Sequence, residues 1–232
     1  MEDGKTGYDP SPVNPLPPVV LGLFLAIFAV EGVFAAAEAG LIGGAAGIGW
    51  RFEAIEDYGF SPRVLAWMLE TGQWPLEHVL RFVTYPFLHL GFIHMAFAGV
   101  ILLAMGKMVG EVISHAAVLA IFFASSVFGA LIYGLLFAEQ AWLVGAYPGA
   151  YGMIGGFTFI LWARAKSTGG SQVRAFSLIA FLMGIQLVFG LLFGTDNSWV
   201  AELSGFCVGF VTAVLMVPGA RAAILARLRQ QG

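Results

Sequence analysis

Charged side chains are scarce in this sequence: they make up 11% of its 232 residues, whereas 59% of the residues are hydrophobic. A soluble domain of this length has too little interior to bury so much apolar surface, so the composition predicts a protein whose solvent is lipid. An excess of basic residues is also lacking, because the net charge is −3. We therefore expect membrane lipids, and no nucleic acid, among its partners.

Cysteine is nearly absent. The single Cys207 excludes a disulfide within the chain and leaves the redox compartment undetermined. A cleaved signal peptide is not expected either, because the N-terminal stretch MEDGKTGYDPSPVNPLPP is acidic and rich in proline, and such a peptide has a basic start and a short apolar core.

Long apolar runs are abundant and predict an all-α membrane protein. A helix that crosses a bilayer needs about 20 apolar residues. Six runs approach this length, at residues 18–37, 92–109, 115–137, 146–163, 175–194 and 199–218. We expect one membrane domain of six helices over residues 15–218, preceded by a short segment (1–14) and followed by a basic tail (219–232).

The connection between the first two runs, residues 38–91, is long and amphipathic. It carries Trp50, Trp67 and Trp74, and tryptophan is enriched at the interface between lipid and water. Stretches such as RVLAWMLETG are therefore expected to lie in that interface.

The distribution of Lys and Arg predicts the orientation. Six spans put both termini on one side of the membrane, and eight of the eleven basic residues lie on that side. The other three, Arg51, Arg63 and Arg81, lie in the long connection. The positive-inside rule then places both termini in the cytoplasm, and we expect a bacterial inner membrane.

Two histidines precede or open the second span. His89 and His94 are five residues apart, about 140° around a helix, so they are not expected to share a face or to bind a metal together. No metal and no cofactor are expected. His89 is expected in the loop. For His94 two interpretations stay open: it binds a backbone group at the helix start, or it points into a polar cavity.

Glycines and acids mark the later spans. The stretch GAYPGAYGMIGG (145–156) contains the GxxxG pairs Gly145–Gly149 and Gly152–Gly156, and Gly205–Gly209 is a third pair, so close helix packing is expected there. Glu202 stands at the start of the sixth span, and a carboxylate at such a position needs a partner. Glu31 raises the same question in the first span, on the same helix face as Glu38.

Taken together, these pieces resemble the rhomboid family of intramembrane serine proteases. HLGFIHMAFA resembles its H-x₄-H-x₃-N motif at His89 and His94, and GAYP resembles its G-x-S-G motif at Gly145. ELSGFCVG resembles H-x₂-G-x₃-G at Gly205 and Gly209, and Tyr151 and Gly155 also match. The resemblance covers roughly residues 15–218 and implies a six-helix bundle with a long first outer loop.

The departures from the family pattern fall on the chemistry that the resemblance implies. Tyr147 stands at the position of the serine nucleophile and Glu202 at that of the histidine base. On the side of the oxyanion, Ala98 replaces an asparagine beside His94, and Pro148 removes a backbone N–H. Loss of the nucleophile or the base alone lowers the rate by about 10⁶, so no catalytic residue is expected.

We therefore expect a pseudoprotease that binds transmembrane segments of other proteins through His94, Tyr147, Tyr151 and Glu202. Glu202 is expected to pair with His94 or with the Tyr147 hydroxyl. Two alternatives stay open: an active protease with an unconventional site, or a structural subunit of a membrane complex. Ser125, Ser126 and Ser204 are the serines considered for a relocated site, and serines in spans usually bind a carbonyl four residues back.

Overall fold

The computed structural model describes residues 15–139, 142–193 and 197–217. The predicted terminal segments 1–14 and 219–232 lie outside these ranges. Within the described residues the chain is helical, and Phe60 and Leu143 form an isolated β-bridge. The six predicted spans correspond to the helices α1 (Pro18–Glu38), α6 (Phe92–Val112), α7 (His115–Leu136), α8 (Tyr147–Thr168), α9 (Ser177–Phe193) and α10 (Trp199–Met216). The all-α fold class is confirmed.

Five segments of the described residues are long and apolar enough to cross a membrane: α1, α6, α7, α10 and the segment Gln172–Leu192, which contains most of α9. The sixth predicted span, α8, is not among them, although it has 22 residues. Its four glycines and its charged end at Arg164 and Lys166 lower its hydropathy. A crossing by α8 therefore stays a prediction.

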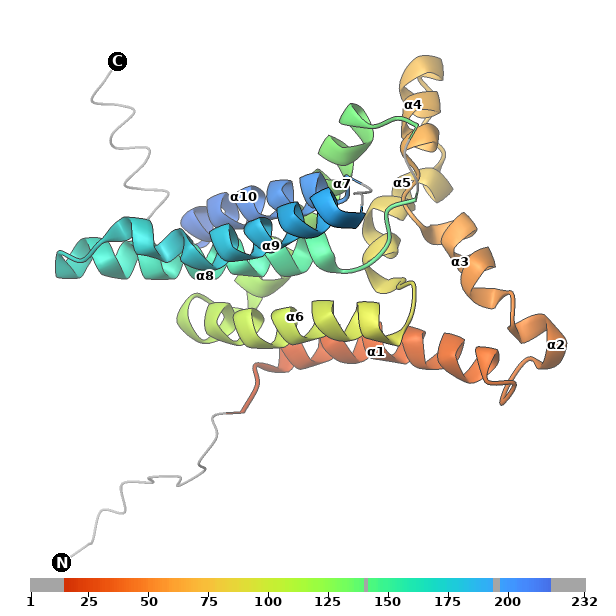
Figure 1. Cartoon of the computed structure of the whole chain (residues 1–232), viewed down its shortest axis with the longest axis horizontal. Helices are drawn as coiled ribbons and strands as arrows, with labels where there is room; N and C mark the ends of the chain where they lie inside the picture. The colour runs from red at the N-terminus through yellow and green to blue at the C-terminus, as the bar shows by residue number, and fades with distance from the viewer. Residues whose placement is uncertain (1–14, 140–141, 194–196, 218–232) are drawn as a thin grey trace, which may run out of the picture.

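The long connection folds as short helices at one end of the bundle (Figure 1). They are α2 (Gly44–Gly47), α3 (Trp50–Tyr58), α4 (Pro62–Thr71), α5 (Leu76–Thr84) and the 3₁₀ turn η1 (Tyr85–Phe87). Trp67 and Trp74 are exposed, as are Leu69 and Leu76. Apolar side chains without protein cover suit the lipid–water interface predicted for this segment.

Helix α8 lies at the centre of the fold, against α6, α7 and α10 (Figure 1). Its glycines serve different neighbours. A side chain at Gly155 would meet the Phe206 carbonyl oxygen of α10 at 2.1 Å, whereas one at Gly149 would meet the Phe122 ring of α7 at 2.7 Å. Of the two GxxxG pairs in 145–156, Gly145–Gly149 is divided between His94 and Phe122. Gly152 and Gly156 both meet side chains of α7.

The closest approach of two backbones is between α8 and α10. A Cβ atom at Gly209 would lie 2.1 Å from the Gly152 carbonyl oxygen, and one at Gly205 would lie 2.2 Å from the Pro148 carbonyl oxygen. Backbone at these points cannot rotate aside as a side chain does. The Gly205–Gly209 pair is thus a packing face, as its spacing predicted, and it holds the start of α8 against the start of α10.

Helix α9 belongs to the least buried of the five apolar segments: 12% of the most apolar stretch of Gln172–Leu192 is buried, against 50% for α7. Phe181, Leu187 and Leu191 are all more than 60% exposed. Few of its residues touch the rest of the bundle, and its principal neighbour is the short 3₁₀ helix η2 (Gln172–Phe176) that precedes it. Its apolar surface is left for lipid or for a partner.

We predict that Gly209→Ala destabilises the fold by about 1–3 kcal/mol, since the added methyl group overpacks a backbone contact. Thermal unfolding of the purified protein in detergent measures this change. Gly184→Ala in α9 is the matched control, because a Cβ atom there meets nothing within 4 Å. Equal melting temperatures for both variants would contradict the packing described here.

Candidate functional site

Arg51 of the long connection binds two carboxylates of α1. Its Nη1 lies 2.7 Å from Glu31 Oε2 and its Nε lies 2.6 Å from Glu38 Oε1. Glu31 and Arg51 are only 2% and 5% exposed. Burial alone would lower the pKa of Arg51, but the two carboxylates raise it above its ordinary value. Glu31, whose role the sequence left unexplained, is thus one partner in a buried ion pair.

The same guanidinium also fixes the loop before α6. Arg51 Nη1 donates to the His89 carbonyl oxygen at 2.6 Å. The His89 ring is fully buried, and its Nε2 accepts a hydrogen bond from the Ala146 N–H at 3.2 Å. One chain of contacts therefore runs from α1 through Arg51 and His89 to the turn that opens α8. His89 lies in the loop, as predicted, and acts there as a backbone acceptor.

The turn before α8 passes between the two histidines. A side chain at Gly145 would meet His94 Cε1 at 2.8 Å and His89 Cδ2 at 3.5 Å, and its φ of +100° also favours glycine. The Gly145 N–H donates to the Tyr85 carbonyl oxygen. Helix α8 then begins at Tyr147 with Pro148 in its first turn, where a missing N–H is tolerated.

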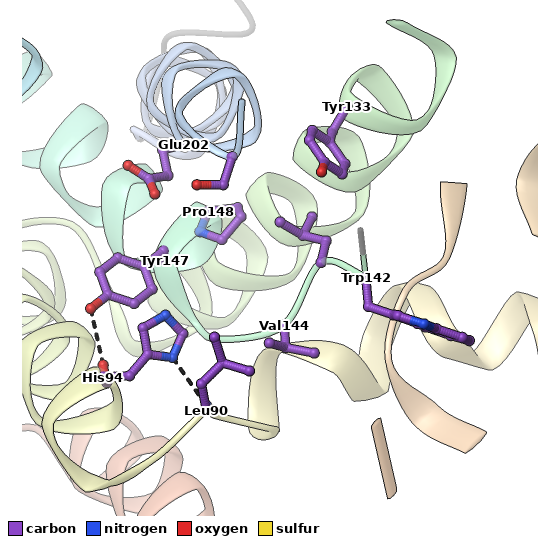
Figure 2. A pocket seen from close by; sticks show the side chains of 10 residues that line it. Leu90, His94, Tyr133, Trp142, Val144, Tyr147, Pro148 and Glu202 are labelled. Atoms are coloured by element: carbon purple, nitrogen blue, oxygen red, sulfur yellow. Dashed lines mark hydrogen bonds between the residues drawn. The ribbon is translucent and has the colours of Figure 1, made fainter. Parts of the chain in front are cut away.

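His94, Tyr147 and Glu202 line one cavity of about 60 Å³, which has room for only a few water molecules (Figure 2). The His94 and Tyr147 rings are stacked at a tilt, with centroids 4.7 Å apart. The complete lining is Leu90, His94, Tyr133, Trp142, Leu143, Val144, Tyr147, Pro148, Ser198 and Glu202. Three of the four predicted binding residues thus come together from α6, α8 and α10.

Two of the residues placed at the site by sequence are buried beside the cavity and do not line it. Tyr151, one turn further along α8, is 4% exposed and packs in an apolar cluster with Ile154, Ile179 and Phe206. Ala98 is fully buried in the main core. Neither lines the cavity. The Tyr151 phenol nevertheless interacts with the Glu202 carboxylate, so its predicted role in binding stays a prediction.

Two partners were predicted for Glu202, and pairing with His94 stays a prediction, whereas the proton of the Tyr147 hydroxyl is used elsewhere. That hydroxyl donates its single proton to the His94 carbonyl oxygen at 3.0 Å (Figure 2). Glu202 instead accepts a hydrogen bond from Nε2 of Gln186, on α9. Sequence reasoning missed Gln186, although a lone amide in the apolar run 175–194 is a signal of the same kind as a lone carboxylate.

The imidazoles of both histidines already use an acceptor nitrogen. A neutral imidazole has one such nitrogen. In His89 it is Nε2, bound by Ala146, and in His94 it is Nδ1, which accepts from the Leu90 N–H at 3.3 Å. His94 therefore satisfies both interpretations left open by its position, since it binds backbone at the helix start and lines the cavity.

Hydroxyl groups at other positions were also candidates for a nucleophile. Ser126 donates to the Phe122 carbonyl oxygen four residues back, and Ser125 is fully buried against Gly152. Neither of these, nor Ser204, lines the cavity. Ser198, just before α10, does line it and was missed, because it precedes the motif that drew attention to Glu202.

Within the residues that the structure describes, no group of three His, Cys, Asp or Glu side chains is placed to hold a metal ion.

Among known proteins, a family model described as a Rhomboid domain matches residues 76–219, which is more than half of the chain. The match covers the site and the helices from α5 to α10, whereas α1 to α4 lie outside it. No curated protein matches the chain.

We predict that Arg51→Met destabilises the protein by about 3–5 kcal/mol, because it leaves the Glu31 carboxylate buried without its partner. Thermal unfolding in detergent measures the loss, and adding Glu31→Met should restore part of it. Arg63→Met is the control, since Arg63 and its partner Glu139 are 71% and 85% exposed. An Arg51 variant as stable as the Arg63 variant would contradict the role given to the buried pair.

A pH dependence follows from His89. Burial, together with the nearby His94 and Arg51 charges, lowers its pKa to about 3, from an ordinary value near 6.5. The unfolded chain therefore binds the proton more readily, and stability falls as the pH drops below about 6.5. Between pH 7.5 and pH 5, titration of His89 should lower the free energy of unfolding by about 2 kcal/mol.

The measurement compares the unfolding of the wild type with that of His89→Gln, whose amide oxygen can still accept the Ala146 N–H. Other titrating groups are common to both proteins, so the difference in pH dependence isolates His89. We expect the variant to lose the acid-side slope; parallel curves would show that His89 is not buried as a neutral ring.

Proposed function

The chain belongs to the rhomboid family, and from that premise we propose that it binds transmembrane segments of partner proteins without cleaving them. In this proposal both termini are cytoplasmic and the cavity faces the outer side of a bacterial inner membrane. Membrane domain 15–218 forms the receptacle, and its partners are proteins whose assembly, stability or quality control depends on being held.

The observation that carries the proposal is the state of the Tyr147 hydroxyl. It stands where the family has its serine and donates its proton to the His94 backbone carbonyl. A nucleophile must instead give its proton to a general base. The acceptor nitrogens of His89 and His94 are bound to backbone N–H groups, so neither ring offers a base in this arrangement.

The turn before α8 also offers few backbone N–H groups to stabilise an oxyanion. Such a charge is bound by N–H groups that point at it. In the turn at 145–148, the Gly145 N–H is bound by Tyr85 and the Ala146 N–H by His89, and Pro148 has none. The Gly145 and Ala146 donors are therefore already used within the fold.

A place for a bound segment is supplied by α9 and α10. An apolar cavity of about 490 Å³ lies between them, and Met183, Leu187, Leu191, Trp199 and Leu203 contribute to its lining. The sparse packing of α9 leaves this side of the bundle open to a partner helix. A receptor for transmembrane segments needs such an apolar entrance beside a polar end.

Two rival functions make different predictions. An active protease would need a hydroxyl such as that of Ser198, the serine that shares the cavity with His94. A fixed subunit of a membrane complex would need a constant partner on the exposed apolar faces. The experiment below separates all three.

We predict that the purified protein is not labelled by a fluorophosphonate probe and does not cleave a rhomboid test substrate, since neither histidine offers a base and the Gly145 and Ala146 amides are already bound. An active rhomboid protease serves as the positive control. Labelling that disappears in Ser198→Ala would establish the protease instead. In mild detergent, co-purification of several membrane proteins in small amounts supports the binder, whereas one stoichiometric partner supports the subunit.

A further inference from the structure

We infer that this site selects transmembrane segments that carry a lysine near the end lying beside the start of α10. The inference rests on the proposed function and names the class of segment that it binds. It comes from two acceptor groups, Glu202 and Gln186, and from the aromatic rings beside them.

Glu202 links the small polar cavity to the apolar cavity between α9 and α10. Its carboxyl group lines the small polar cavity with Tyr147 and His94, while its hydrogen-bond partner Gln186 lines the apolar cavity between α9 and α10. A helix lying in the apolar cavity therefore has its side chains next to Gln186, with Glu202 directly behind. The butyl stem of a lysine can follow the apolar lining while its ammonium group reaches the carboxylate.

Gln186 supplies a second acceptor. Its Nε2 donates to Glu202, and its Oε1 is buried without a hydrogen-bond donor in the described part of the chain. A buried amide oxygen without a donor is unfavourable, and a ligand that brings a donor relieves this cost. An ammonium group has three donors and no acceptor, so it can bind the Glu202 carboxylate and Gln186 Oε1 together.

The rest of the polar cavity also favours a cation. Its lining includes one carboxyl group and neither lysine nor arginine in the residues that the structure describes. The Tyr147 ring contributes an aromatic face, which attracts a cation that has left water. The volume of about 60 Å³ suits a compact ammonium group with little accompanying water.

The same charges predict which transmembrane segments bind weakly. A segment with a glutamate at the same position would place a second carboxylate beside Glu202 and a further acceptor beside Gln186 Oε1. A glutamine there would offer a donor without charge. The order of affinity is therefore lysine, then glutamine, then glutamate, with the apolar contacts of the segment unchanged.

The test uses the full-length protein in lipid nanodiscs and fluorescent, Leu/Ala-based transmembrane peptides that differ at one position near the outer end. Binding is measured by energy transfer for the Lys, Gln and Glu peptides and for a peptide with the lysine at its centre. We expect the outer-end Lys peptide to bind roughly tenfold or more tightly than the Gln peptide. The peptide with a central lysine should show no such gain.

Glu202→Gln should remove the preference for lysine, so that the Lys and Gln peptides bind this variant with affinities within about twofold of each other. Gln186→Leu, which removes the second acceptor, should reduce the preference. Equal binding of all peptides by the wild type would overturn the selection but leave the proposed function standing. Binding of none of the peptides would overturn both the selection and the proposed function. A lysine preference that survives in Glu202→Gln would overturn the role of the carboxylate.

Discussion

The buried ion pair between Arg51 and Glu31 is the constraint on which the geometry of the site depends. A charge taken into a low-dielectric interior is tolerated only with a well-placed partner. Here the guanidinium meets Glu31, Glu38 and the His89 carbonyl at once. Because His89 in turn holds the Ala146 N–H, the first helix and the long connection determine where α8 begins. The orientation of Tyr147 follows from that position.

Much of the fold follows from composition alone. Apolar runs near the length of a bilayer predict helices, and the described bounds of α1, α6 and α10 lie within a few residues of the expected ones. The glycines at 205 and 209 predict a close contact, which is present. Sequence spacing does not say which helix a glycine faces, because that depends on crossing geometry. Gly155 meets the backbone of α10, for example, whereas Gly149 meets a side chain of α7.

The site was predictable in its membership but not in its connections. The family motifs bring His94, Tyr147 and Glu202 to one cavity, as expected. Two of the connections come from segments outside the motifs: Gln186 of α9 binds Glu202, and Arg51 of the long connection binds the His89 carbonyl. Such long-range pairs leave no periodic pattern in the sequence, and each is visible only as a polar residue with no local reason to be there.

Pro148 has a consequence beyond the oxyanion. A serine at 147 and a histidine at 202 would match the side chains of the family motifs, but the turn would still lack an amide hydrogen at 148. The Gly145 and Ala146 amides would still be bound to Tyr85 and His89. In the proposed function, the main chain of this turn therefore limits hydrolysis as well as the side chains, and exchanging the two reactive groups alone would not supply that backbone donor.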